Sequence, residues 1–257
     1  MKVEVSRAGA VETITLNRPE VLNALDQETK AAYLAALRKA ARDPEVRAVV
    51  LSGSGRAFCA GEDLKSHPEG VPRSFRHSLV SGYNPIIQTI VEMDKPVIAR
   101  LQGVAAGAGL SIALAADLRI GTDATRLIAA FSRIGLVPDS GLSQTLERFV
   151  GPGVALELFY TARPMEAAEA VRWGILNTVV AADQLDATVA SWAQDLAAGP
   201  TLAFALTKQA VRRAYQASLS DQLSYEAAAQ ELAGASADHR EGVSAFLAKR
   251  APRFSGR

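Results

Sequence analysis

The stretch LQGVAAGAGLSIALAA, residues 101–116, decides how the chain folds. Its 16 residues carry no charge between Arg100 and Asp117, and they follow an apolar run at 96–100 that is typical of a strand. A membrane span needs roughly 20 predominantly apolar residues. The glycines at 103, 107 and 109 also break the run. The stretch therefore predicts a buried strand, a tight turn and an apolar helix.

The same alternation runs through the first half of the chain. Period-two and helical patterns predict a hairpin at 3–16, a helix at 29–42 with a stripe of Ala32, Leu34, Leu37 and Ala41, a strand at 48–51, a helix at 83–93, and strands at 118–120 and 127–131. Strands separated by helices favour an α/β core with parallel pairing.

From about residue 140 onward the signals become helical. Apolar periodicity predicts helices at 142–150, 166–173, 184–197, 202–217 and 222–233. Gly199-Pro200 is the clearest break, so we expect a core at 1–200 and a C-terminal helical segment at 201–257. So short a segment does not bury a core of its own, and we expect it to pack on the main body or on another subunit.

Composition excludes several classes of protein. Lys and Arg total 28 against 27 for Asp and Glu, which argues against binding to nucleic acid. The single cysteine, Cys59, rules out an internal disulfide, and three scattered histidines make a metal site unfavourable. Charges at Lys2, Glu4 and Arg7 interrupt any signal-peptide core. We expect a cytoplasmic protein without a membrane segment.

Two glycine-containing loops each follow a predicted strand. They are Ala57–Lys65 (AFCAGEDLK) and Gly103–Ser111 (GVAAGAGLS), and the second opens an apolar helix. Backbone N–H groups at a helix start have no partner within the helix, so one from each loop could hold an oxyanion. The alternative is that the glycines only permit tight turns. A dinucleotide fingerprint is disfavoured because Ile112 stands where a third small residue is needed.

Taken together, these loops resemble the crotonase (enoyl-CoA hydratase/isomerase) superfamily. The matching segments are FCAGEDL at 58–64, VAAGAG at 104–109, GLVPDSG at 135–141, NRP with LNAL at 17–25, and REGV with FLAKR at 240–250. They cover essentially the whole chain in the family's order. The resemblance implies a ββα superhelix with a C-terminal oligomerisation segment. Within the superfamily, the chain is most similar to isomerases of bacterial phenylacetate degradation.

The resemblance also assigns roles. The oxyanion hole would be the N–H groups of Glu62 and Ala108, gripping the thioester carbonyl of an acyl-CoA substrate, with no separate cofactor. Further substrate-binding positions would be Leu25, Ala60, Lys65, Gly107, Phe131, Phe246 and Lys249, of which the last two would reach the coenzyme A of a neighbouring subunit. It also implies a homotrimer or a dimer of trimers, formed through 201–257.

The departures from the family indicate the reaction. The hydratases of the superfamily use two glutamates, and those positions hold Ser111 and Phe131 here. Asp139 remains as a candidate acid and base, and isomerases of the superfamily carry an aspartate at that position. From local sequence alone, Asp139 could instead cap the helix that follows it. Burial beside Phe131, Ile134 and Leu136 would raise its pKa and make it a better base.

We therefore expect an acyl-CoA isomerase that shifts a double bond or isomerises a ring epoxide. Two alternatives are an enoyl-CoA hydratase with an unusual second acid and a non-catalytic acyl-CoA-binding subunit. Among weaker candidates, Cys59 is expected to be a buried thiol rather than a nucleophile, and Asp63 a cap for the next turn. His67 and His77 are expected at the surface, in a polar 66–82 loop that could form a lid.

Overall fold

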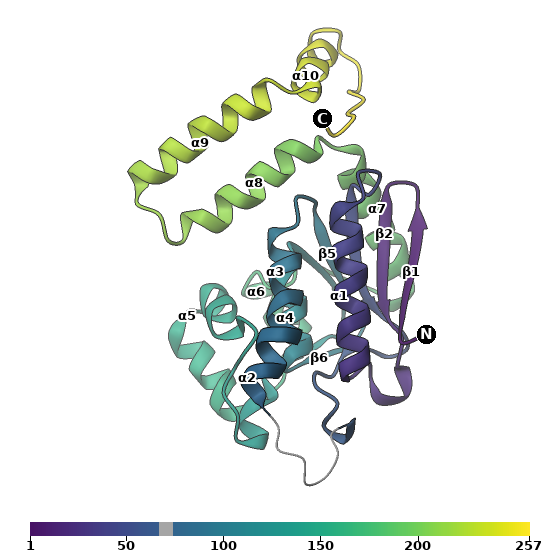
Figure 1. The fold of residues 1–257 in the computed structure, drawn as a ribbon, viewed down its shortest axis with the longest axis vertical. Coiled ribbons are helices and arrows are strands. Elements are labelled where there is room, and N and C mark those ends of the chain that lie inside the picture. The colour runs from purple at the N-terminus through teal and green to yellow at the C-terminus, as the bar shows by residue number, and fades with distance from the viewer. Residues whose placement is uncertain (67–73) are drawn as a thin grey trace.

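The computed structural model describes residues 1–66 and 74–257, and it confirms an α/β fold, here built on two sheets (Figure 1). The larger sheet has six strands in the order β1-β2-β3-β5-β7-β10, and the smaller has four in the order β4-β6-β8-β9. The strands are β1 Val3–Ala8, β2 Val11–Leu16, β3 Ala48–Gly53, β4 Ala57–Cys59, β5 Val97–Leu101, β6 Val104–Ala106, β7 Leu118–Thr122, β8 Arg126–Ile128, β9 Met165–Glu166 and β10 Thr178–Val180. Only β1–β2 and β8–β9 pair antiparallel.

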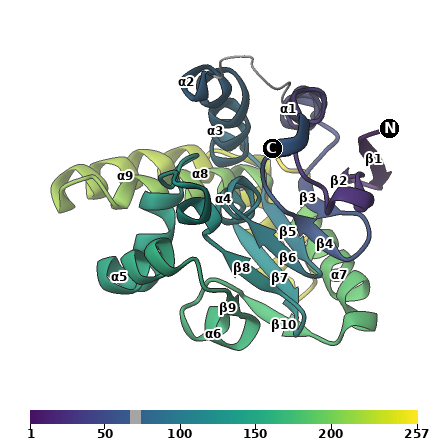
Figure 2. The ribbon, with the colours of Figure 1, turned by 90° about the horizontal axis from the view of Figure 1, so that it is seen from below.

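Helices cover both faces of the larger sheet (Figure 2). They are α1 Gln27–Arg42, α2 Phe75–Ser78, α3 Asn84–Glu92, α4 Ala108–Ala115, α5 Leu142–Thr161, α6 Ala167–Arg172, α7 Leu185–Ala198, α8 Thr201–Ala214, α9 Leu219–Gly234 and α10 Ala237–Leu247. The strand period of two explains the layers, because successive side chains point to opposite faces. Val49 and Leu51 of β3 pack into the core with α1, α3 and α4, whereas Ala48 and Val50 pack against α7. None of the helices in the described ranges is long and apolar enough to cross a membrane.

Several sequence-based boundaries were wrong. The two glycine-containing segments contain short strands, β4 and β6, which pair in parallel and start the smaller sheet. The strand expected at 127–131 ends at Ile128, and a 3-10 helix at Ala130–Ile134 follows. Strands β9 and β10 were missed because their two and three residues are too short to show a period. In α1, the predicted stripe residues Leu34 and Leu37 are buried and Ala41 is partly buried, whereas Ala32 is exposed. The buried face also includes Lys30, Tyr33 and Ala40, which the prediction missed.

The expected 66–82 loop is largely helical where the structure describes it. Helix α2 is followed by a π-helical turn at Leu79–Tyr83, which leads directly into α3. His77 is exposed, as expected, and His67 lies outside the described residues.

The last three helices stand apart from the sheets. Helices α8 and α9 form an antiparallel pair that projects from the body, and α10 lies at the end opposite to α2 (Figure 1). The C-terminal residues are bound to the start of α10. There the Asp238 carboxylate accepts hydrogen bonds from the N–H groups of Ser255 and Gly256. Arg47 attaches the same region to the body through Thr201 and the Phe254 carbonyl.

Candidate active site

A cavity of about 240 Å³ lies where the two glycine-containing segments, α4 and the α2–α3 segment meet. The lining residues are Ala60, Gly61, Glu62, Leu64, Phe75, Ser78, Leu79, Tyr83, Gly107, Ala108, Ala130, Phe131, Arg133, Ile134, Leu136 and Asp139. Six predicted site residues are therefore brought together here: Ala60, Glu62, Gly107, Ala108, Phe131 and Asp139.

Glycines allow the two segments to approach each other closely. Gly109 faces β4 so tightly that a Cβ built on it would lie 2.3 Å from the carbonyl oxygen of Cys59. A Cβ on Gly61 would lie 2.9 Å from the carbonyl oxygen of Ala106, and Gly61 has a φ of +96°. Neither position tolerates a side chain, so glycine here is a requirement of packing and of backbone conformation. The close approach puts the Glu62 and Ala108 backbones on one wall of the cavity.

Helix α4 begins at this wall. Gly107 is its N-cap, with a φ of 51°, and no side chain caps the helix. The Gly107 N–H donates to the carbonyl of Ile128, which fixes the start of the helix against β8. The N–H of Ala108 belongs to the first turn, which has no acceptor within the helix and lies at the positive end of the helix dipole. This end of α4 suits a developing negative charge.

Asp139 lines the cavity from a tight turn. Ser140 and Gly141, the next two residues, both have left-handed backbones with φ of 53° and 78°. The Ser140 hydroxyl donates a 2.8 Å hydrogen bond to Oδ1 of Asp139. The N-cap of α5 is Gly141, without a side-chain hydrogen bond, so the alternative in which Asp139 is the N-cap of this helix does not hold. Its carboxylate is instead half-buried at the cavity.

Phe131 and Ser111, which the resemblance matches to the two glutamates, are both close to this site: Phe131 lines the cavity and Ser111 contacts Asp139. Phe131 is 7% exposed, and the 3-10 helix that holds it turns its ring into the cavity lining. Ser111 is buried in α4, and its hydroxyl contacts the carbonyl oxygens of Gly107 and Asp139 at 3.4 and 3.3 Å. Ser111 is thus a hydrogen-bonded helix serine. Neither residue supplies a carboxylate.

The side chain of Glu62, for which the resemblance implies only a backbone role, brings a second carboxylate to the cavity lining. The Glu62 side chain accepts hydrogen bonds from the Tyr83 hydroxyl and from the Lys30 ammonium, the latter at 3.2 and 3.3 Å. Burial of Tyr83 and the charge of Glu62 both raise the pKa of the phenol, which therefore stays protonated. Lys30, only 3% exposed, also donates to Ser78 at 3.2 Å. The sequence does hold one signal for this ion pair: Lys30 is a lysine at a position on the buried face of α1.

Four predicted substrate-binding residues lie outside the cavity. Leu25 is fully buried, and its backbone N–H and C=O bond to Gly61 and Asp63. Lys65 is exposed next to the cavity residue Leu64. Phe246 lies in α10 and Lys249 two residues after its end, and both are exposed. Helix α10 itself lies at the end of the molecule opposite to α2 (Figure 1).

Cys59 and Asp63 behave as structural residues. Burial raises the pKa of the Cys59 thiol to about 12, so it is not a nucleophile at neutral pH. The Asp63 carboxylate accepts from the N–H of Lys65 at 3.2 Å and pairs with Arg18 at 2.8 Å. Across residues 1–66 and 74–257, no group of three or more His, Cys, Asp or Glu is arranged to hold a metal ion.

One cavity is therefore lined by the start of α4 at Ala108, by the carboxylates of Glu62 and Asp139, and by Phe131. Residues 6–257 match the family model described as enoyl-CoA hydratase/isomerase. The chain is 41% identical over 250 residues to the 1,2-epoxyphenylacetyl-CoA isomerase of Escherichia coli K12. The matched residues cover 96% of this chain and 95% of that protein.

Other relatives carry the name hydratase. The chain is 33% identical over 249 residues to the short-chain-enoyl-CoA hydratase of Clostridium acetobutylicum, covering 96% of this chain and 95% of that one. The crystal structure of an enoyl-CoA hydratase from Bacillus anthracis superposes with a TM-score of 0.94 at 30% identity, over 100% of both chains. The protein belongs to the enoyl-CoA hydratase/isomerase family, as its sequence motifs predicted. The family acts on acyl-CoA thioesters.

Proposed function

We propose that the protein is an acyl-CoA isomerase that moves a double bond, or isomerises a ring epoxide, through an enolate. The observation that carries this proposal is the environment of Asp139, which lines the same small cavity as Phe131 and as Ala108 at the start of α4. A single carboxylate in that place can take a proton from one carbon and return it to another. Similarity to 1,2-epoxyphenylacetyl-CoA isomerase supports the same class of reaction.

For a 3-enoyl-CoA, the proposed steps balance without a co-reactant. The ionised Asp139 removes a proton from C2, and the electron pair of that C–H bond forms the C1–C2 double bond of a dienolate. The negative charge moves to the thioester oxygen, where the N–H groups of Glu62 and Ala108 stabilise it. Asp139 then returns the proton to C4, and the electrons shift back to leave the 2-enoyl product. The hydrogen bond from Ser140 keeps the carboxylate oriented during both transfers.

The test is a paired assay of 3-hexenoyl-CoA and crotonyl-CoA with mass spectrometry of the products. The proposal expects conversion of the first substrate to its 2-enoyl isomer, without a gain in mass of the second. In Asp139→Asn, which keeps the shape of the side chain, turnover should fall by about 10³-fold or more while acyl-CoA affinity stays unchanged. Turnover retained in that variant would remove Asp139 from the mechanism.

A hydratase is the second candidate, because the Glu62 carboxylate lines the same cavity as Asp139. Two carboxylates could in principle add both parts of water across a double bond. Lys30 and Tyr83 both donate to Glu62, however, so the oxygens of this carboxylate are already engaged by protein donors. Addition of one water to crotonyl-CoA at a rate comparable with isomerisation would favour the hydratase.

We further propose that coenzyme A lies outside the cavity, with Lys65 close to its phosphates and the backbones of Leu25 and Ala60 near its adenine. The exposed ammonium of Lys65, one residue beyond the cavity-lining Leu64, suits a phosphate. Lys65→Ala should raise KM with little change in kcat, because a phosphate contact is equally strong in ground and transition states.

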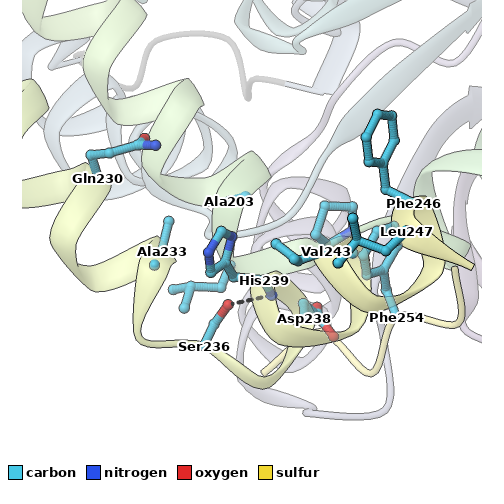
Figure 3. A pocket seen from close by; sticks show the side chains of 14 residues that line it. Ala203, Gln230, Ala233, Ser236, Asp238, His239, Val243, Phe246, Leu247 and Phe254 are labelled. Atoms are coloured by element: carbon cyan, nitrogen blue, oxygen red, sulfur yellow. Dashed lines mark hydrogen bonds between the residues drawn. The ribbon is translucent and has the colours of Figure 1, made fainter.

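We also propose assembly into homotrimers, or dimers of trimers, through residues 201–257. Large apolar side chains are exposed along these helices: Val211, Leu219, Leu223, Leu232, Phe246 and Leu247. Helices α8, α9 and α10 form a groove with a largely apolar lining, to which Val243, Phe246 and Phe254 contribute (Figure 3). Phe246 and Lys249 would then reach a neighbouring subunit's coenzyme A. Light scattering gives the oligomeric state, and a monomer at micromolar concentration would overturn this proposal.

A further inference from the structure

The buried contact between Lys30 and Glu62 is not explained by the reaction steps above. Lys30 belongs to α1, and its side chain is 3% exposed, whereas lysine is rarely buried without a specific partner. Its ammonium lies 3.2 Å from the Glu62 carboxylate. The same ammonium lies 4.8 Å from the centre of the Tyr83 ring. Three elements therefore meet at one charged group: α1, the segment after β4, and the π-helical turn before α3.

Glu62 creates an electrostatic problem at this place. Its own backbone N–H is one of the two proposed donors to the enolate oxygen, and its side chain lines the same cavity. A carboxylate only a few bonds from that N–H repels the negative charge that develops on the substrate. In a partly buried site, such repulsion is much stronger than in water. Something must offset the charge of Glu62 if the enolate is to form readily.

We propose that Lys30 is an electrostatic positioning residue, which offsets the charge of the Glu62 carboxylate and keeps that carboxylate turned away from the enolate oxygen. The Tyr83 hydroxyl also donates to Oε2 of Glu62 and so helps to hold the same carboxylate in place. Lys30 itself does not line the cavity and acts only through Glu62. The proposal rests on the proposed function, since it concerns the enolate intermediate.

Charge removal on each partner tests this role. The Lys30→Met variant withdraws the positive charge but keeps most of the side-chain volume. Its kcat on 3-hexenoyl-CoA should fall roughly tenfold, with KM changed much less, because the enolate is destabilised more than the ground state. The double variant Lys30→Met with Glu62→Gln removes both charges, and its kcat should return to within about threefold of the wild type. A purely structural contact predicts no such rescue.

A second readout does not depend on turnover. Acetoacetyl-CoA ionises to an enolate, and its near-ultraviolet absorbance reports the fraction bound in that form. Lys30→Met should reduce the enolate fraction on the enzyme, and Glu62→Gln alone should increase it. The wild type could bind acetoacetyl-CoA as its enolate and yet not isomerise 3-hexenoyl-CoA. The proposed function would then fail, but the enolate fractions on the two variants would still test the role of Lys30. If Lys30→Met does not fold, the enolate fraction on Glu62→Gln alone decides whether the proposal holds.

Lys95→Met is the matched control. Lys95 is also a buried lysine, 7% exposed, but it donates to the carbonyls of Ala40 and Asp43 at the C-terminal end of α1. The control should lower the melting temperature and leave kcat per folded molecule unchanged. Equal loss of kcat in both lysine variants, a double variant as slow as Lys30→Met, or an enolate fraction that Glu62→Gln does not raise would overturn the proposal.

Discussion

The hydroxyl of Ser111 lies 3.3 Å from the carbonyl oxygen of Asp139, to which it donates a hydrogen bond. This contact joins α4, which begins at the cavity, to the turn that presents the Asp139 carboxylate. We infer that the serine positions Asp139, the proposed acid and base. The proposed geometry thus depends on a contact between a side chain and a backbone.

Ser111→Ala tests this positioning. Loss of the hydrogen bond leaves the carbonyl of Asp139 without one donor inside a buried turn, so the carboxylate gains freedom. We expect kcat for isomerisation to fall about 3- to 30-fold while the affinity for butyryl-CoA stays the same. Thr145→Ala removes a comparable hydroxyl, bonded to the carbonyl of Gly141, and serves as control. A loss of affinity in Ser111→Ala instead of kcat would contradict a positioning role.

Gly109→Ala should prevent the correct approach of α4 to β4. The added Cβ would lie 2.3 Å from the Cys59 carbonyl oxygen and 2.8 Å from the Cys59 Cβ, so backbone atoms must move. We expect a loss of at least 2–3 kcal/mol in the free energy of unfolding, measured with urea, and a loss of turnover. Gly153→Ala is the control, because no atom lies within 4 Å of its Cβ, and alanine is the better helix former. Similar stability of the two variants would show that the contact relaxes easily.

Asp26→Ala should destabilise the start of α1. The carboxylate caps the helix by accepting from the N–H of Thr29 at 2.8 Å, and it pairs with Lys2 at 2.7 Å. Replacing an N-cap aspartate costs about 0.5–2 kcal/mol, which chemical unfolding at pH 7 measures. Asp186→Ala, whose carboxylate is 79% exposed, should change stability by less than about 0.5 kcal/mol.

The same variant has a defined pH dependence. Burial raises the pKa of Asp26, but the hydrogen bonds from Lys2 and Thr29 outweigh it and hold the pKa well below its ordinary value of 3.8. The unfolded chain therefore binds the proton first as pH falls, and the stabilisation is complete above about pH 4 and lost below it. The difference between wild type and Asp26→Ala should shrink from pH 5 to pH 2. A constant difference would mean that the charge of Asp26 contributes nothing.

Cys59 should be inert in the folded protein. Its thiol is fully buried and donates to the carbonyl of Asn23 at 3.2 Å, and burial raises its pKa from 9.0 to about 12. Iodoacetamide at pH 8 should label the native protein slowly and the urea-unfolded protein at one equivalent. Above pH 9 the unfolded thiol ionises while the folded thiol keeps its proton, so Cys59 lowers stability as pH rises. Rapid labelling of the native protein would contradict this burial.

The sequence by itself determined the α/β class, the hairpin at the N-terminus, and the helical character of the last third. Those features follow from local periodicity and from Gly and Pro punctuation, which act over a few residues. The motifs around Gly61, Gly107 and Asp139 also identified the family, and the resemblance placed six of the sixteen residues that line the cavity. The same motifs did not reveal β4 and β6, because each has three residues and owes its strand conformation to the other.

Tertiary structure alone decided how the side chains meet. Lys30 and Glu62 are separated by 32 residues, and only the packing of α1 against the segment after β4 brings their charges together. The orientation of Asp139 was likewise settled by two successive left-handed residues and by Ser111 from a distant helix, not by local capping preference. Local patterns specify which elements form because their free energies depend on near neighbours. The chemistry of the site depends on contacts between elements, and those are fixed only when the sheets and helices close on one core.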